Sequence, residues 1–181
     1  SGTNSGTGTI NLGGAGSGNS PRIELANNAT FTNDGAITGS TAGGSRIDLN
    51  NGSMFENNGS ISMTNGDARI ELDNNATFTN TNGATVSLTG NNSRIEFANT
   101  SDFINDAGGT VTLNPGNNQE VRIVANFNST GTFTNNGMLN VNTTGTGKDL
   151  QIETGNMALG GFSVLNQANV NSLLSAAVFG A

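Results

Sequence analysis

The chain has 181 residues, of which 33% are hydrophobic and 10% charged, and its formal net charge is −7 at neutral pH. It has no His, Cys, Trp or Tyr, so the commonest acid–base side chain, thiolate chemistry, disulfides and the usual structural zinc ligands are all missing. The acidic balance argues against a nucleic-acid partner, and no apolar run is long enough to predict a transmembrane segment.

The composition is polar, but the apolar residues follow a periodic pattern. Asn and Gly together supply roughly a third of the chain, which would be typical of disorder if the apolar residues were scattered. They instead recur at fixed spacing, which indicates a folded repeat array.

The first 21 residues contain a partial repeat. The segment 9–14, Thr-Ile-Asn-Leu-Gly-Gly, resembles the second half of a later unit, such as 60–64, Ser-Ile-Ser-Met-Thr. We therefore interpret residues 1–21 as an N-terminal half-rung or extension, so that the chain opens in the middle of a repeat.

Six repeats follow over residues 22–173. Each begins with a tetrad like Arg-Ile-Glu-Leu, and the tetrads are spaced by 24, 23, 25, 28 and 29 residues. A Phe comes eight to ten residues after each Ile, and then an Asn/Gly turn and a second apolar pair or single. The units cover residues 22–45, 46–68, 69–93, 94–121, 122–150 and 151–173.

Apolar and polar residues alternate within these segments, which predicts strands with Ile and Leu inward and Arg and Glu outward. Asn and Gly between the strands tolerate positive φ. An antiparallel array of hairpins is one possible architecture, since Asn-Gly favours hairpins. A period of about 24 residues with identical residues at equivalent positions instead favours an all-β parallel solenoid with one coil per repeat.

In such a solenoid, like residues stack on like residues about 4.8 Å apart. The predicted core ladder is Ile23, Ile47, Ile70, Ile95, Ile123 and Ile152, with Phe31, Phe55, Phe78, Phe103, Phe133 and Phe162. A third column holds Asn33, Asn57, Asn80, Asn105 and Asn135, whose amides can hydrogen-bond along the stack.

The tetrads also predict an exposed ladder of alternating charge. It comprises Arg22, Arg46, Arg69, Arg94, Glu24, Asp48, Glu71 and Glu96. These columns could bind a carbohydrate or a partner, but we favour a role in keeping the face soluble and blocking lateral sheet association.

Thr residues flank several of the Phe residues, as Thr30 and Thr32 flank Phe31. Such arrays resemble those of ice-binding solenoids. The second unit has Met54 and Glu56 at these positions, so the array is interrupted and good strand propensity is the simpler explanation for Thr.

We expect no enzymatic activity. The acidic residues occupy repeated positions, whereas a catalytic site breaks a repeat, and residues 144–149 lack the full spacing of a phosphate-binding loop. No calcium-binding repeat is present. The sequence thus predicts no catalytic, cofactor-binding or metal site.

The chain ends in an apolar, uncharged tail, residues 174–181. Solenoids normally carry polar caps, because an open rung exposes apolar core and strand edges. We find no cap at either end and predict head-to-tail contact between the last rung and tail of one copy and the opening half-rung of the next. The alternative is a fragment of a longer chain. The predicted contact residues are Ile10, Leu12, Val170, Leu173, Leu174, Val178 and Phe179.

The segments 31–37, Phe-Thr-Asn-Asp-Gly-Ala-Ile, and 132–141, Thr-Phe-Thr-Asn-Asn-Gly-Met-Leu-Asn-Val, resemble repeats of bacterial autotransporter passengers and filamentous-haemagglutinin-type adhesins. The resemblance covers about residues 22–150. It implies a right-handed parallel β-helix, secretion, and a role in adhesion or biofilm. The chain departs from these families in its short length and in lacking a recognisable secretion cap or translocator.

Two functions follow as hypotheses. The first is a structural subunit of an extracellular or cell-surface fibre, whose partner is a further copy of itself. The second is the stalk or binding region of an adhesin, whose partners are surface glycans or other matrix components. Ice binding is a distant third.

Overall fold

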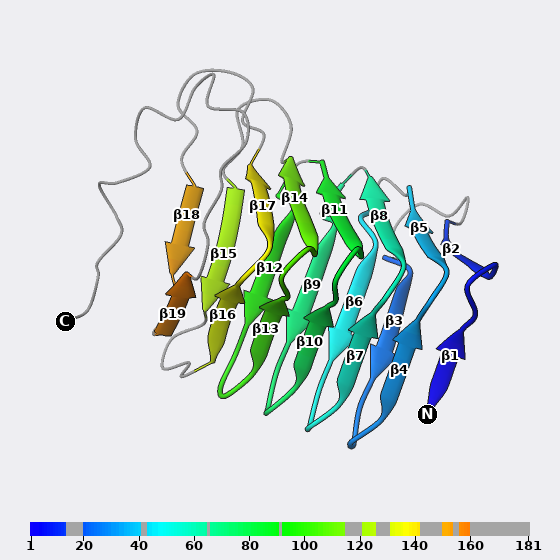
Figure 1. Cartoon of the computed structure of the whole chain (residues 1–181), viewed down its shortest axis with the longest axis horizontal. Helices are drawn as coiled ribbons and strands as arrows, with labels where there is room; N and C mark the ends of the chain where they lie inside the picture. Colours follow the sequence, from blue (N-terminus) through cyan, green and yellow to red (C-terminus); the bar gives the residue numbers. More distant parts are fainter. Residues whose placement is uncertain are drawn as a thin grey trace.

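The computed structural model describes residues 1–13, 20–40, 43–64, 66–90, 92–114, 121–125, 131–141, 150–153 and 156–159. It confirms the predicted fold class: the chain is an all-β parallel solenoid, in which each complete coil gives one strand to each of three sheets (Figure 1). Five coils are complete, from β3–β5 to β15–β17, and two strands extend the stack at each end.

The three sheets are named A, B and C. Sheet A contains β1 (Gly2–Asn4), β4 (Thr30–Asn33), β7 (Met54–Asn57), β10 (Thr77–Asn80), β13 (Asp102–Asn105), β16 (Thr132–Asn135) and β19 (Asn156–Leu159). Sheet B contains β2 (Thr9–Leu12), β5 (Ala36–Gly39), β8 (Ser60–Thr64), β11 (Thr85–Thr89), β14 (Thr110–Asn114) and β17 (Met138–Val141). Sheet C contains β3 (Arg22–Leu25), β6 (Arg46–Leu49), β9 (Arg69–Leu72), β12 (Arg94–Phe97), β15 (Val121–Ala125) and β18 (Leu150–Glu153).

The opening segment contains more structure than the sequence predicted. Strand β2 pairs with β5, as expected of a half-rung. Strand β1 also pairs with β4 and places Gly2 beside Phe31. We did not predict β1, because Gly2 occupies the position at which the later units have Phe.

The core lies between the sheets and consists of the predicted columns. Ile47, Ile70 and Ile95 are fully buried, and each is the register partner of the next. Ile23 and Phe31, in the first complete coil, are only partly buried and pack against this core. Burial of a large aliphatic or aromatic side chain contributes roughly 1.5–3 kcal/mol, so each added coil strengthens the stack.

The Phe column forms a continuous stack of rings. Successive ring centroids from Phe31 to Phe133 lie 5.3, 5.1, 4.8 and 5.4 Å apart, and the rings of Phe78 and Phe103 are within 6° of parallel. This spacing is close to the 4.7–4.9 Å between neighbouring strands, so the sheet itself sets the stacking distance. The stack is therefore a consequence of repeating one residue type at one position in each coil.

The two well-described corners use Asn and Gly for different reasons. Between sheets C and A, Asn51 has φ 52° and Gly52 has φ 72°, so this corner needs the left-handed conformation. Between sheets A and B, Gly59 follows Asn58 but does not have positive φ. A Cβ on Gly59 would lie 2.0 Å from the carbonyl oxygen of Gly35, so glycine is needed there for close approach of successive coils.

The last coil differs from the predicted alignment at one position. Ile152 lies on β18 as the register partner of Ile123, as the Ile column requires. The register partner of Phe133 is Met157, whereas we had assigned that column position to Phe162, which lies outside the described residues.

Candidate functional site

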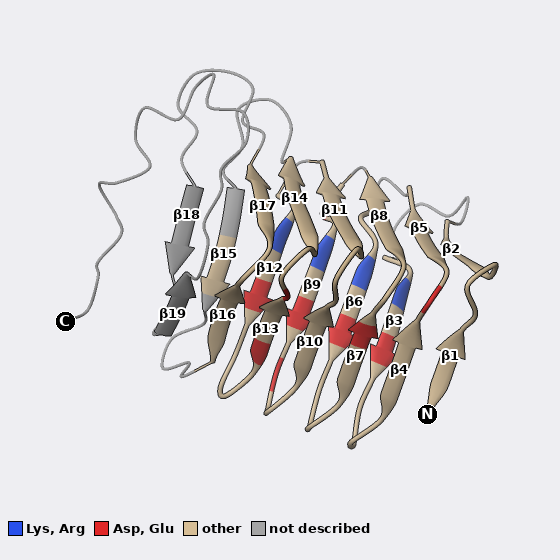
Figure 2. Cartoon of the chain, in the orientation of Figure 1, with Lys and Arg blue, Asp and Glu red and all other residues tan. Residues whose placement is uncertain are grey.

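The three outer faces differ in chemistry. Sheet C carries the columns of Arg and acidic residues, visible as adjoining blue and red bands across β3, β6, β9 and β12 (Figure 2). Sheet A carries Thr with isolated acidic residues, and the described strands of sheet B carry no charged residue at all.

The charge ladder on sheet C is a connected network, less exposed than predicted. The side chain of Arg22 is 52% exposed, but that of Arg69 is only 12% exposed. Arg69 lies 2.5 Å from Glu71 on its own strand and 3.8 Å from Glu96 on the next coil. Ion pairs of this depth are screened less by solvent and salt than surface pairs are.

Asp67 belongs to this network and was missed in the sequence. Its carboxylate lies 2.6 Å from the guanidinium of Arg69, 2.5 Å from that of Arg94 and 3.8 Å from that of Arg46. Asp67 precedes its tetrad by two residues and is Gly44 or Asn92 in the adjoining coils, so no repeated pattern marked it. One unrepeated carboxylate thus connects Arg residues from three coils.

Asp48 is the most buried charged residue of the ladder, with 8% of its surface exposed. Its pKa is raised to about 6, mainly by burial and further by the charge of Glu71 and a hydrogen bond to Glu71, whereas the charges of Arg22 and Arg46 act in the opposite direction. Asp48, Glu71, Asp73 and Glu96 all line a shallow groove of about 220 Å³ on this face. Within the described residues, no group of three or more acidic side chains is arranged to hold a metal ion.

The predicted Asn column is confirmed as a buried hydrogen-bonded ladder. From Asn33 to Asn135, the side-chain Nδ2 of each Asn donates to Oδ1 of the Asn in the next coil, at 2.7–2.8 Å. Asn4 extends the ladder by donating to Asn33 at 2.7 Å. The segment Thr3-Asn4-Ser5-Gly6 matches Thr32-Asn33-Asp34-Gly35, and this match was the signal that could have identified β1.

The outer face of sheet A is interrupted as the sequence indicated. The register places Thr77 and Thr79 beside Met54 and Glu56, so Thr pairs do not continue from coil to coil. Met54 is 55% exposed. The arrangement does not provide the regular Thr array expected of an ice-binding face.

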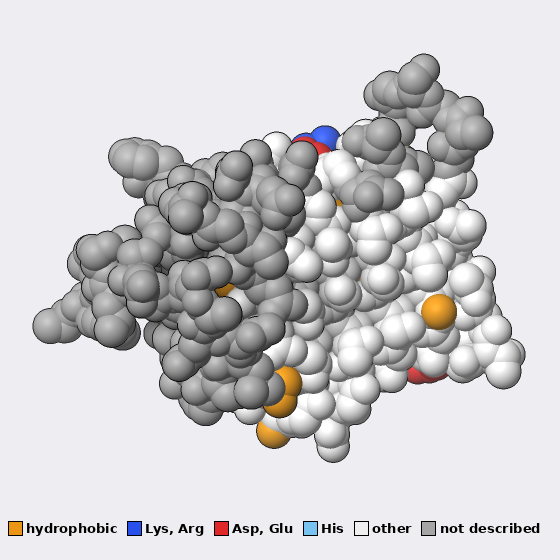
Figure 3. Space-filling model, turned by 90° about the horizontal axis from the view of Figure 1, so that it is seen from above, with side chains coloured by type: hydrophobic (Ala, Val, Ile, Leu, Met, Phe, Trp, Pro, Cys, Tyr) orange, Lys and Arg blue, Asp and Glu red, His pale blue; other side chains and the backbone are white. Residues whose placement is uncertain are grey.

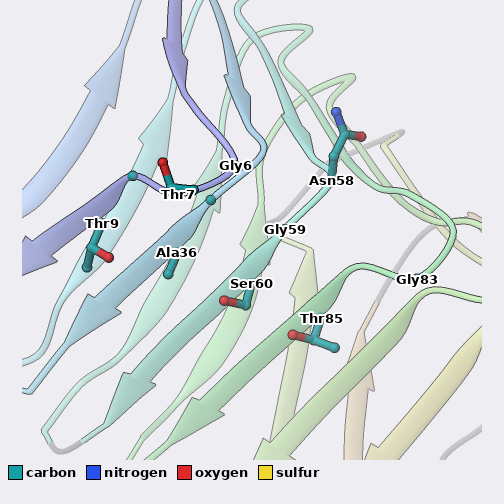
Figure 4. A pocket seen from close by; sticks show the side chains of 11 residues that line it. Gly6, Thr7, Thr9, Ala36, Asn58, Gly59, Ser60, Gly83 and Thr85 are labelled. Carbon is teal, nitrogen blue, oxygen red and sulfur yellow. The ribbon is translucent and has the colours of Figure 1, made fainter.

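Sheet B has an uncharged outer surface with a groove beside it. Outward positions such as Ser60 and Thr85 are exposed hydroxyls that follow one another along the stack (Figure 4). A groove of about 380 Å³ runs past them and is lined by small residues, including Gly35 and Gly59. Figure 3 shows one face of the described residues, seen from above. This face consists mainly of backbone and uncharged polar side chains, with a few hydrophobic and charged atoms.

The predicted contact residues are only partly described. Ile10 and Leu12 lie on β2, the terminal strand of sheet B, where Leu12 is buried and Ile10 is partly buried against the core. The other predicted contact residues lie outside the described residues: Val170, Leu173, Leu174, Val178 and Phe179.

The fold and its faces define a repeat protein of the parallel β-solenoid class. Neither the models of known protein families, nor the curated proteins, nor the solved structures contain a match to this chain. In the part of the chain that the structure describes, no helix is long and apolar enough to cross a membrane.

Proposed function

We propose that this chain is a structural subunit of an extracellular or cell-surface fibre, which lengthens by head-to-tail stacking of coils. The observation that carries the proposal is the continuity of the axial ladders. Ile, Phe and Asn repeat at equivalent positions in the five complete coils, so each of these coils presents the same column residues to the next. The resemblance to repeats of secreted bacterial adhesins supports the location outside the cell.

The N-terminal edge of the stack supports assembly by this route. Strands β1, β2 and β3 are each the last strand of their sheet on that side. Ile10, Ile23 and Leu25 are partly exposed there, whereas their register partners in the next coil are buried: Ile37, Ile47 and Leu49. A further coil on this edge would pair backbone groups and cover apolar surface, both of which stabilise the joined form.

The test compares assembly of the native chain with that of two variants on the same strand. Ile10→Lys places a charge at the partly buried edge, while Thr9→Lys places the same charge on the exposed outer face. We expect concentration-dependent filaments from the native chain and from Thr9→Lys, seen by negative-stain microscopy and sedimentation, and none from Ile10→Lys. A native chain that stays monomeric at every concentration, or equal assembly by both variants, would contradict the proposal.

A second candidate is the stalk or binding region of an adhesin. The uncharged, hydroxyl-lined face of sheet B and its groove favour it, because neutral glycans are recognised by hydrogen-bonding groups. A stable monomer that binds glycans or matrix components would support this candidate over the first.

A further inference from the structure

Asp48 lacks the hydrogen-bond donors that a buried carboxylate requires. Its Oδ1 is inaccessible to solvent and has no hydrogen-bond partner. The closest cation to its Oδ2 is the Nε of Arg22, at 3.6 Å, which is too long for a hydrogen bond. An ionised carboxylate without donors is costly to bury, so the charge must be reduced or compensated locally.

The cations around Asp48 compensate its charge only in part. On its own strand, Arg46 lies 3.8 Å from both Asp67 and Glu71. On β3, Arg22 makes its closer contact, 3.0 Å, with Glu24, the register partner of Asp48. Arg22 therefore lies closer to Glu24 than to Asp48. Arg46 is equally close to two other carboxylates, those of Asp67 and Glu71.

On β9, Glu71 is the other register partner of Asp48. Arg69 lies 2.5 Å from Oε1 of Glu71 and is also 3.8 Å from Glu96. Asp48 thus lies in a column of carboxylates, with an acidic residue on each neighbouring strand, and its ion pair with Arg22 is shared with Glu24. Two stacked, half-buried carboxyl groups of this kind are more stable with one proton between them than with two negative charges.

We propose that Asp48 and Glu71 hold one proton in common, and that this pair makes the coils containing β6 and β9 more stable in mildly acidic than in alkaline surroundings. The proton neutralises the buried carboxyl group of Asp48, so that its unpaired Oδ1 is no longer part of a buried charge, while Glu71 keeps its 2.5 Å contact with Arg69. Loss of the proton leaves two adjacent charges in the column and weakens the contact between the coils.

The sign of the pH dependence follows from the raised pKa of Asp48. Between the ordinary value of 3.8 and about 6, the folded chain holds a proton that the unfolded chain releases. The free energy of unfolding therefore falls as the pH rises through this window, and the destabilisation is complete above about pH 6. About two pKa units correspond to at most roughly a 100-fold change in the folding equilibrium.

The direct test is a ¹³C NMR titration of the Asp48 carboxyl carbon, assigned by its loss in Asp48→Asn. We expect a midpoint near pH 6 in the native chain and a lower midpoint in Glu71→Gln, which removes the neighbouring charge. A native midpoint below about 4.5 would overturn the proposal. An unchanged midpoint in Glu71→Gln would show that burial alone raises the pKa and would refute the shared proton.

Denaturation across pH gives the second readout. Asp48→Asn should flatten the loss of stability between pH 4 and 6.5 and should unfold less readily than the native chain at pH 7.5. Asp34→Asn removes the same charge from an exposed turn and should keep the native pH profile. If both variants keep the native profile, Asp48 is not the titrating group.

Discussion

The buried Asn ladder leads to a quantitative prediction at Asn80. The Asn80 side chain is fully buried and accepts from Asn57 at 2.8 Å. It donates to Asn105 at 2.8 Å and to the backbone oxygens of Ala84 and Thr110 at 3.2 and 3.3 Å. Asn80→Ala removes all four contacts and leaves a small cavity.

The cost of Asn80→Ala can be worked from what its partners retain. Asn57 keeps contacts to two backbone oxygens, of Gly59 and Thr85, so it loses only one bond. Oδ1 of Asn105 loses the donor that it has in the native chain, inside the core, and an unsatisfied buried acceptor costs about 1–3 kcal/mol. Adding about 1 kcal/mol for the bond lost by Asn57 and about 1 kcal/mol for the cavity gives an expected destabilisation of about 3–5 kcal/mol. The contacts to the backbone oxygens of Ala84 and Thr110 are long, at 3.2 and 3.3 Å, and add little.

The matched control is Asn58→Ala. Asn58 makes three side-chain hydrogen bonds, with Asp34, Glu56 and Thr81, one fewer than Asn80, but it is exposed. Water replaces these bonds after mutation, so we expect a loss below about 1 kcal/mol.

Urea denaturation followed by circular dichroism measures both variants. Native-state hydrogen exchange of the coils beside Asn80 should be faster in Asn80→Ala than in Asn58→Ala, because coils in repeat proteins open locally. Equal destabilisation by the two substitutions would refute the reasoning, since it would mean that the number of bonds matters and their burial does not.

Three further predictions concern the stack, the corner and the charge network. Phe78→Ala should cost about 3–5 kcal/mol in urea denaturation and Phe31→Ala clearly less, because Phe31 is already partly exposed; equal losses would contradict the importance of position in the stack. Gly59→Ala should lower the thermal midpoint and shift backbone amide signals of the facing coil, because its Cβ would clash with a backbone oxygen; an unchanged midpoint would show that the corner can expand. Asp67→Asn should destabilise by about 1 kcal/mol at low salt and less at high salt, and a loss independent of salt would argue against an electrostatic role.

The core could be predicted from the sequence because the fold repeats itself. Ile47, Ile70 and Ile95 recur at one point of each unit, and one register satisfies all of them. The Asn ladder was predictable for the same reason. Repetition converts a weak local pattern into a specific three-dimensional arrangement.

The features that sequence reasoning missed or misplaced are those that do not repeat. Asp67 occurs in a single unit, yet it contacts Arg residues from three coils. Asp48 occupies the tetrad position that Glu24, Glu71 and Glu96 occupy in other coils, and its burial was not apparent from that repeated position. Phe162 fitted the spacing from the preceding Ile, but the register brings Met157 to Phe133, since the length of a turn is not fixed by the strand pattern.

The direction of the hydrogen bonds has a mechanical consequence. The ladders of all three sheets run along the long axis, as do the Asn amides and the stacked rings. Tension applied between the two ends is therefore shared by all the bonds that join one coil to the next. Such a rod resists stretching until an entire junction between coils separates, so it transmits force with little extension and fails in discrete steps.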